Sequence, residues 1–131
     1  MKKVYDFLKK CKTFYVATID GDQPRVRPFG VCEIIEDKLY FSTSNTKPFW
    51  KQITKNPNIE ICAYDGQINY LRVSAKAIPD SRNIVKDAML KGNPHLEQIY
   101  KEYDKTVILF YISQATATFE DFNGKKEIIK F

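Results

Sequence analysis

The sequence is poor in the residue types that assemble most catalytic and metal sites. Its one histidine, His95, follows a proline at a predicted helix start, which favours a surface or capping role over a Ser-His-Asp or Cys-His arrangement. A histidine-based metal site is not expected either. Its three cysteines, Cys11, Cys32 and Cys62, are widely spaced and include no C-x-x-C pair. They therefore predict free, buried thiols in a reducing compartment.

Long apolar runs and glycine-rich phosphate loops are also missing. No segment approaches the ~20 apolar residues of a membrane span, and the N-terminus carries no secretory signal pattern, so the expected location is the cytoplasm. Neither a Walker A loop nor a G-x-G-x-x-G motif occurs, and the acidic pair Asp20 and Asp22 belongs to a turn. An enzyme made from this chain would need a bound cofactor to carry its reaction.

The charge balance indicates an anionic partner. The chain has a formal net charge of +5, which favours a nucleotide, a phosphate ester or nucleic acid. The basic residues are dispersed, however, without the long Lys/Arg run of a polynucleotide track. With 131 residues, 44% of them hydrophobic, the chain is expected to form one globular domain over residues 1–131.

Short β-branched and aromatic segments separated by turn residues dominate the pattern. Strands are predicted at 13–19, 23–29, 30–35, 38–42, 59–64, 69–77, 106–112, 115–119 and 127–131. Helices are predicted at 2–11, at 47–55, between 81 and 91, and at 95–103. The segment 13–19 is apolar on both faces and is expected to be a central strand buried on both sides. The architecture that follows is a mostly antiparallel barrel or sandwich with helical insertions.

A strand with two arginines is the first half of a candidate anion site. Arg25 and Arg27 alternate with Val26 and Pro28 at a period of two, so both guanidinium groups face one side. Burying them is costly unless an anion meets them. Because Pro24 and Pro28 cannot donate to a ladder, the strand is expected at a sheet edge, or bulged at Pro28.

A strand end followed by a helix start is the second half. The hydroxyl residues Ser42, Thr43 and Ser44 precede a helix that Asn45 or Thr46 could cap and in whose first turn Pro48 is acceptable. Lys47 and Lys51 are four residues apart and rise from one side of that helix. Hydroxyls, free amides and two ammonium groups near a helix N-terminus suit a phosphate. The spacing from the arginines suits a neighbouring antiparallel strand; the alternative is a solvated basic surface.

The order of these motifs resembles a known family. Arg-x-Arg-Pro at 25–28, Ser-Thr at 42–43, Lys47, Lys-Gln-Ile at 51–53 and Asn-Pro at 56–57 are similar to the pyridoxamine 5′-phosphate oxidase-like family of FMN-binding split β-barrels. The segment 115–131 resembles a short bacterial subgroup of that family. The similarity extends over essentially the whole chain.

The resemblance implies a mainly β fold, a six-stranded antiparallel split barrel of Greek-key type with helical insertions. It also implies a homodimer with FMN at the subunit interface. The strand containing Arg25, Val26, Arg27 and Pro28 would lie along the flavin. Ser42 and Thr43 would meet the phosphate end, and Lys47 and Lys51 would pair with the phosphate.

The departures from the family pattern narrow the expected function. Residues 124–127 read Gly-Lys-Lys-Glu and lack the Arg-x-His-type substrate motif, so oxidation of pyridoxamine phosphate is not expected. Haem ligation is disfavoured because His95 lies in a helical insertion. The expected function is a flavin-dependent oxidoreductase that exchanges electrons or hydride with a nicotinamide donor and a small-molecule acceptor. The alternatives are a non-enzymatic flavin-binding or stress-related module and a small basic nucleic-acid-binding domain.

Overall fold

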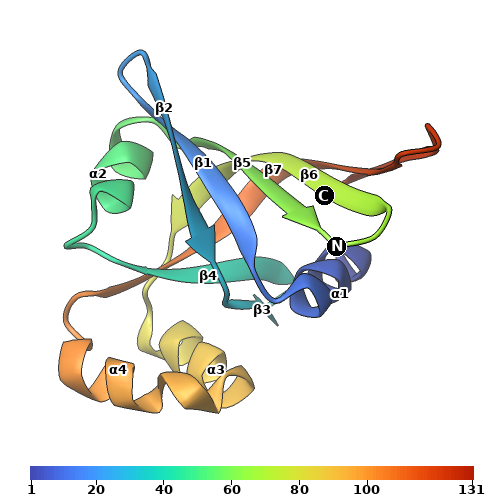
Figure 1. Ribbon diagram of the computed structural model, residues 1–131. Coiled ribbons are helices and arrows are strands. Elements are labelled where there is room, and N and C mark those ends of the chain that lie inside the picture. Colours follow the sequence, from blue (N-terminus) through green and yellow to red (C-terminus); the bar gives the residue numbers. More distant parts are fainter.

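The computed structural model describes residues 1–131. The elements follow one another as α1 (Lys2–Cys11), β1 (Phe14–Asp20), β2 (Gln23–Phe29), β3 (Cys32–Ile35), β4 (Lys38–Ser44), α2 (Pro48–Lys55), β5 (Asn58–Tyr64), β6 (Asn69–Pro79), α3 (Asn83–Gly92), η1 (Pro94–Leu96), α4 (Glu97–Tyr103), β7 (Val107–Asp121) and β8 (Lys126–Lys130). The predicted mainly β architecture with helical insertions is confirmed (Figure 1).

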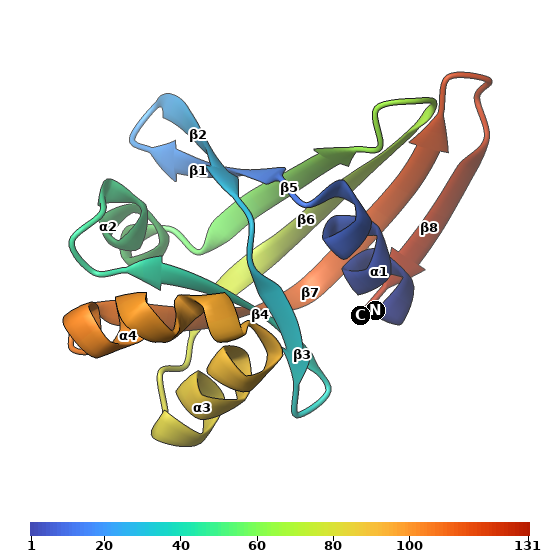
Figure 2. The same ribbon diagram turned by 60° about the horizontal axis from the view of Figure 1, so that its bottom comes forward.

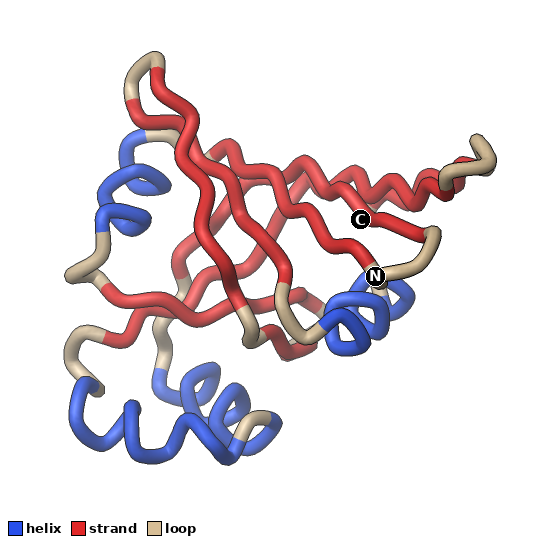
Figure 3. Tube along the Cα trace, in the orientation of Figure 1, coloured by secondary structure: helices blue, strands red, loops and turns tan.

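All strand pairs are antiparallel and form one strongly curved sheet. The strand order is β2-β1-β5-β6-β7-β4-β3, and β8 pairs with β7. The two ends of this order, β2 and β3, follow each other in the chain but are not hydrogen-bonded to each other, so the barrel is split (Figure 3). The sheet has eight strands rather than the six expected. The predicted edge position of β2 is confirmed, and its pairing with β1 is regular through Pro28, without a bulge.

The predicted strands at 106–112 and 115–119 are one continuous strand, β7, of 15 residues. Gln114 has a positive φ of 50°, and the register between β6 and β7 shifts between Ser74 and Lys76. The extra residue at this bulge bends β7 without ending it. The prediction of two strands was wrong because a local bend interrupts the alternation in the same way as a strand end.

The prediction that 13–19 is buried on both sides is wrong for the single chain. Phe14, Val16 and Thr18 point into the barrel, whereas Tyr15 and Ile19 are exposed on its outer face. The cysteines are free, as predicted, but only Cys32 is buried; Cys11 is half-buried and Cys62 is exposed.

Two apolar clusters hold the fold together. The larger fills the barrel and includes stacked Phe41 and Phe110, whose ring centroids lie 5.4 Å apart. The smaller joins α3 and α4 to the β3–β4 hairpin through Met89 and Tyr100. Figure 2 shows α3 and α4 lying together beside β3 and β4, while α1 lies near β8. None of the helices has both the length and the apolarity that a bilayer crossing requires.

Candidate functional site

A cavity of about 480 Å³ opens where the barrel is split. The end of β2 and the loop after it form one wall, and the end of β4 with the start of α2 forms the other. The lining residues are Arg27, Pro28, Phe29, Gly30, Val31, Ser42, Thr43, Lys47, Pro48 and Phe49. The cavity therefore joins the two halves of the anion site that the sequence predicts.

The two halves meet across this space rather than along a ladder. β2 pairs only with β1, whereas β4 pairs with β3 and β7, so the prediction that they are neighbouring antiparallel strands was wrong. The split in the barrel separates them. A ligand can enter between the two walls because no backbone hydrogen bonds close the gap.

The Arg27 guanidinium is held in a fixed orientation inside the cavity wall. Its Nη1 donates to the Val16 carbonyl at 3.2 Å and to Thr18 Oγ1 at 2.7 Å. Its Nη2 donates to Gln52 Oε1 at 2.7 Å, and Thr18 Oγ1 donates to the same oxygen at 2.5 Å. The guanidinium carbon also lies 5.0 Å from the centre of the Phe49 ring. Arg27 thereby connects β1, β2 and α2.

All the protein groups that meet Arg27 are neutral. Arg25, Arg72 and Arg82 are exposed and each forms an ion pair with a carboxylate, whereas Arg27 is half-buried and forms none. Burial, and to a lesser degree the neighbouring Arg25, lower the pKa of Arg27. A cation that is partly desolvated without a counter-charge favours an anionic ligand.

Arg25 does not share this environment. Its Nε donates to Asp20 Oδ2 at 3.0 Å beside the β1–β2 turn, and the residue is absent from the cavity lining. The two arginines that the sequence places on one face thus have different roles in the structure: one is ion-paired at the surface, and the other faces the cavity.

Lys47 lies at the mouth of the cavity, directly before α2. It occupies the N-cap position with extended backbone angles, φ −88° and ψ 148°, and Pro48 takes the first helical position as predicted. No side chain caps the helix, so the predicted capping by Asn45 or Thr46 was wrong. Lys47 is exposed and forms no ion pair, so its ammonium group is available to a ligand.

The hydroxyl residues of β4 divide into two groups. Ser42 and Thr43 line the cavity; Ser42 Oγ lies 3.3 Å from the Tyr100 hydroxyl of α4, and Thr43 is largely buried. Ser44 is outside the lining, and its Oγ bonds to Thr46 Oγ1 at 2.8 Å. Val26 and Lys51 are also outside it: Val26 faces solvent on the outer side of the sheet, and Lys51 is exposed further along α2.

The chemistry available in this cavity is binding rather than proton transfer. Its lining contains cations, hydroxyls and aromatic rings but no carboxylate, imidazole or thiol. Phe29 and Phe49, whose ring centroids lie 5.1 Å apart, supply an apolar wall beside the polar one. The arrangement suits a ligand with an anionic end and a flat apolar part. A phosphate ester of an aromatic ring system has both.

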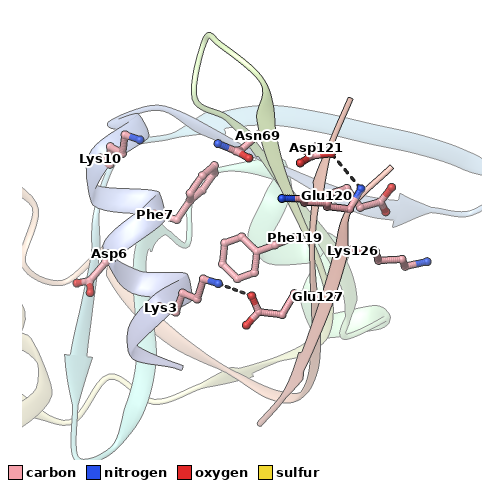
Figure 4. Close-up of a pocket in the computed structure, with 11 residues that line it drawn as sticks. Lys3, Asp6, Phe7, Lys10, Asn69, Phe119, Glu120, Asp121, Lys126 and Glu127 are labelled. Atoms are coloured by element: carbon pink, nitrogen blue, oxygen red, sulfur yellow. Dashed lines mark hydrogen bonds and ion pairs between the residues drawn. The ribbon is translucent and has the colours of Figure 1, made fainter. Parts of the chain in front are cut away.

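A second cavity, of about 730 Å³, lies between α1 and the β7–β8 hairpin (Figure 4). Phe7 and Phe119 meet edge to face at 5.5 Å on its floor, and Lys3 pairs with Glu127 across it. The charged residues around it are Lys3, Lys10, Lys125, Lys126, Asp6, Glu120, Asp121 and Glu127. Lysines and carboxylates are equal in number, so the charge around this cavity favours neither an anionic nor a cationic ligand.

Gln52 is the main site residue that the sequence analysis did not single out as functional. It lies on the buried side of α2 with Phe49 and Ile53, at helical spacing. A polar residue within an apolar stripe needs a hydrogen-bond partner inside the fold, and that was the available signal. Which partner it meets depends on β1 and β2, which are remote in sequence. Tyr100, which contacts Ser42 from the helical insertion, carried no comparable signal.

Two comparisons with known proteins cover most or all of the chain. The family model described as pyridoxamine 5′-phosphate oxidase matches residues 1–107. A NimC/NimA family protein from Clostridium acetobutylicum is 37% identical, with a TM-score of 0.95 over 100% of this chain and 92% of that chain.

More distant structures share the fold alone. General stress protein 26 from Bacillus anthracis is 18% identical, with a TM-score of 0.73 over 99% of this chain and 97% of that chain. The haem storage protein HutZ from Vibrio cholerae is 13% identical, with a TM-score of 0.66 over 98% and 92%. A search of curated proteins gives no match. On the strength of the family model and the Clostridium structure, the chain belongs to the pyridoxamine 5′-phosphate oxidase family.

Proposed function

We propose that the protein binds FMN in the cavity at the split of the barrel and acts as an FMN-dependent oxidoreductase on a small molecule. The observation that carries the proposal is the pairing of two cations that lack carboxylate partners, Arg27 and Lys47, with the hydroxyls of Ser42 and Thr43 around one cavity. A flavin phosphate is close to dianionic at neutral pH and matches this set in charge and in hydrogen bonding.

Each residue has a defined part in binding the phosphate. Lys47 and Arg27 would supply the compensating charge, and each charge-assisted hydrogen bond to the phosphate is worth ~1.5–3 kcal/mol. Ser42 and Thr43 would donate their hydroxyl protons. Ser42 is held in place by its contact with Tyr100, so its hydroxyl loses little freedom when the ligand binds.

The flavin ring would lie along β2. This strand is a sheet edge, so half of its amides and carbonyls face away from β1 and are free to meet the polar edge of the ring. Phe29 and Phe49 would cover part of its apolar face. When bound, FMN would supply electron or hydride transfer between a nicotinamide donor and a small-molecule acceptor. The chain binds and orients the ring and limits the access of water to it.

A homodimer with the site at the subunit interface is part of the proposal. Large apolar side chains are exposed on the outer face of β1, β2 and β5, at Tyr15, Ile19, Val26 and Tyr64. They lie on three adjacent strands, because β1 lies between the other two. Monomers rarely expose such a surface, and a second copy of the chain would bury it. The surface reaches β2, which also borders the cavity.

The cytoplasm is the compartment we propose. The three thiols are unpaired, which fits a reducing environment. The FMN phosphate and the nicotinamide donor are also intracellular metabolites, so the proposed reaction and the proposed location agree.

The test of the proposed function is a visible absorption spectrum of the purified protein, before and after addition of FMN and removal of the excess. Retained flavin bands with a shifted shape are expected; a spectrum without flavin after mixing would overturn the assignment. Oxidation of NAD(P)H with a quinone or nitroaromatic acceptor then separates an enzyme from a flavin store, because a store should not exceed the rate of free FMN.

A further inference from the structure

We propose that Gln52 determines the preference of this site for a phosphorylated flavin: it aims the Arg27 guanidinium at the cavity and, being neutral, leaves its charge free for the ligand. The inference rests on the proposed function, since the ligand is FMN. It concerns a residue of α2 that does not line the cavity, and it makes Gln52 a positioning residue rather than a binding one.

The orientation of the Gln52 amide follows from the chemistry of its neighbours. A guanidinium can only donate hydrogen bonds, so Gln52 must present its oxygen to Arg27 Nη2, at 2.7 Å. The same oxygen accepts from Thr18 Oγ1, which itself accepts from Arg27 Nη1. The three side chains close a ring of hydrogen bonds, which leaves the amide no freedom to rotate.

This ring uses only part of the capacity of Arg27. Both protons of Nη1 and one of Nη2 are taken by the protein, out of the five N–H donors of a guanidinium. The Nε proton and the second Nη2 proton remain. Two donors in one plane with a fixed separation match two oxygens of a phosphate. Gln52 thus selects which edge of Arg27 the ligand meets.

The neutrality of residue 52 matters as much as its shape. A glutamate there would keep the length and the accepting oxygen but would form an ion pair with Arg27. The counter-charge that the cavity now lacks would then come from the protein. Thr18 and Gln52 are both buried, so a charge on either would be poorly screened by solvent and would compete strongly with a ligand anion.

The test compares the affinities of FMN and riboflavin, which share the ring and ribityl chain and differ only in the phosphate. Dissociation constants are measured by flavin fluorescence for the wild type, Gln52→Glu and Gln52→Met. The glutamate variant should weaken FMN binding more than ~10-fold and riboflavin binding by less than ~2-fold. The methionine variant, which has no oxygen to orient Arg27, should weaken FMN binding by ~3–10-fold and should also spare riboflavin.

Lys55→Gln is the matched control, because it changes the charge of α2 by the same amount at an exposed position outside the cavity. Its FMN-to-riboflavin ratio should stay at the wild-type value. If the wild type binds FMN and both Gln52 variants keep its FMN-to-riboflavin ratio, the inference about Gln52 is wrong but the proposed function stands. Failure of the wild type to bind either flavin overturns the proposed function and the inference with it. A purely structural role for Gln52 would weaken both ligands equally.

Discussion

At the scale of single residues, Lys47 and Lys51 have different environments, although the sequence predicts the same role for both. Both belong to the start of the same helix, yet only Lys47 lines the cavity. Lys47 precedes the first helical turn, where the chain still follows the cavity wall. One turn later, the side chain of Lys51 is exposed outside the lining. Their contributions to ligand binding should therefore differ.

We predict that Lys47→Ala weakens FMN binding more than ~10-fold, because it removes a charge partner of the phosphate at a cost of ~1.4 kcal/mol or more. Lys51→Ala removes the same charge from the same helix and should change the affinity by less than ~3-fold. Titration of each variant with FMN measures both values. Equal losses of FMN affinity in the two variants would mean that the phosphate lies near Lys51 as well, outside the cavity at the split of the barrel.

A polar cluster next to the start of α3 is expected to make the stability of the fold depend on pH. The Tyr40 hydroxyl donates to Asp80 Oδ2 at 2.8 Å, and Arg82 donates to both Asp80 oxygens at 2.9 Å. Hydrogen bonds from Arg82 are the main cause that lowers the Asp80 pKa from 3.8 to about 2. Burial, and then the hydrogen bond to Asp80, raise the pKa of Tyr40 to about 12.

The sign of the resulting stability change follows from the Asp80 pKa. Its folded-state value lies below its unfolded value, so the folded chain binds fewer protons and the stabilisation is present above pH ~4. It is lost as the pH falls toward 2. We predict that Asp80→Asn flattens the fall in unfolding free energy over this interval, as measured by urea denaturation. The same slope in wild type and variant would assign the acid sensitivity to other carboxylates.

In the helical insertion, formed by α3 and α4, the sequence periodicity predicts only part of the packing. Val85 and Met89 of α3 are fully buried against the β3–β4 hairpin, while Ile84, on the opposite side of the helix, is 63% exposed. The apolar stripe predicted from the sequence contains Ile84, Val85, Ala88 and Met89; it is confirmed at Val85 and Met89 and wrong at Ile84. Because α4 also contributes Tyr100 to Ser42, packing of the insertion affects the cavity.

We predict that Met89→Ala lowers the unfolding free energy by ~2–5 kcal/mol, since it leaves a void in a close-packed cluster. Ile84→Ala shortens an apolar side chain on the same helix and should change the free energy by less than ~0.5 kcal/mol. Chemical denaturation with both proteins measures the difference. A small effect at Met89 would indicate that α3 and α4 can collapse onto the hairpin and fill the space.

At the scale of the whole molecule, the outer face of the β2-β1-β5 segment exposes large apolar side chains to solvent. Tyr15 lies on β1, the middle strand of this face, opposite Pro28 of β2 and Cys62 of β5, and is 49% exposed. Tyr103, on α4, is exposed to a similar degree, 55%, on another side of the molecule. Under the proposed dimer only the first of the two tyrosines lies at the interface.

We predict that Tyr15→Arg shifts the protein from dimer to monomer and weakens FMN binding, because each subunit would bring an unpaired arginine into an apolar interface. Tyr103→Arg should leave both the mass and the affinity unchanged. Sedimentation velocity and FMN titration test the two variants in parallel. A dimer that survives Tyr15→Arg would mean that the chains associate through a different face.

Local patterns in the sequence were sufficient for most of the elements and for the family. The alternation in β2, the prolines that place it at a sheet edge, and the stripe of α3 each depend on neighbours within a few residues. Local chemistry also indicated an anion site at Arg27, Ser42, Thr43 and Lys47, which line one cavity. Local signals were misleading at Gln114, where a bulge imitates the end of a strand.

The assembly of the site was decided only by the tertiary structure. The packing of β1, β2 and α2 decides that Arg25 meets Asp20 whereas Arg27 faces the cavity. The same packing decides that Gln52 is the partner of Arg27. These contacts join residues between 5 and 34 positions apart, and no periodicity encodes them. The sequence by itself therefore determined most of the strands, the helices and the sign of the charge. The split of the barrel decided which cations face one another across a cavity, because only the curvature of the sheet brings its two unpaired edges near each other.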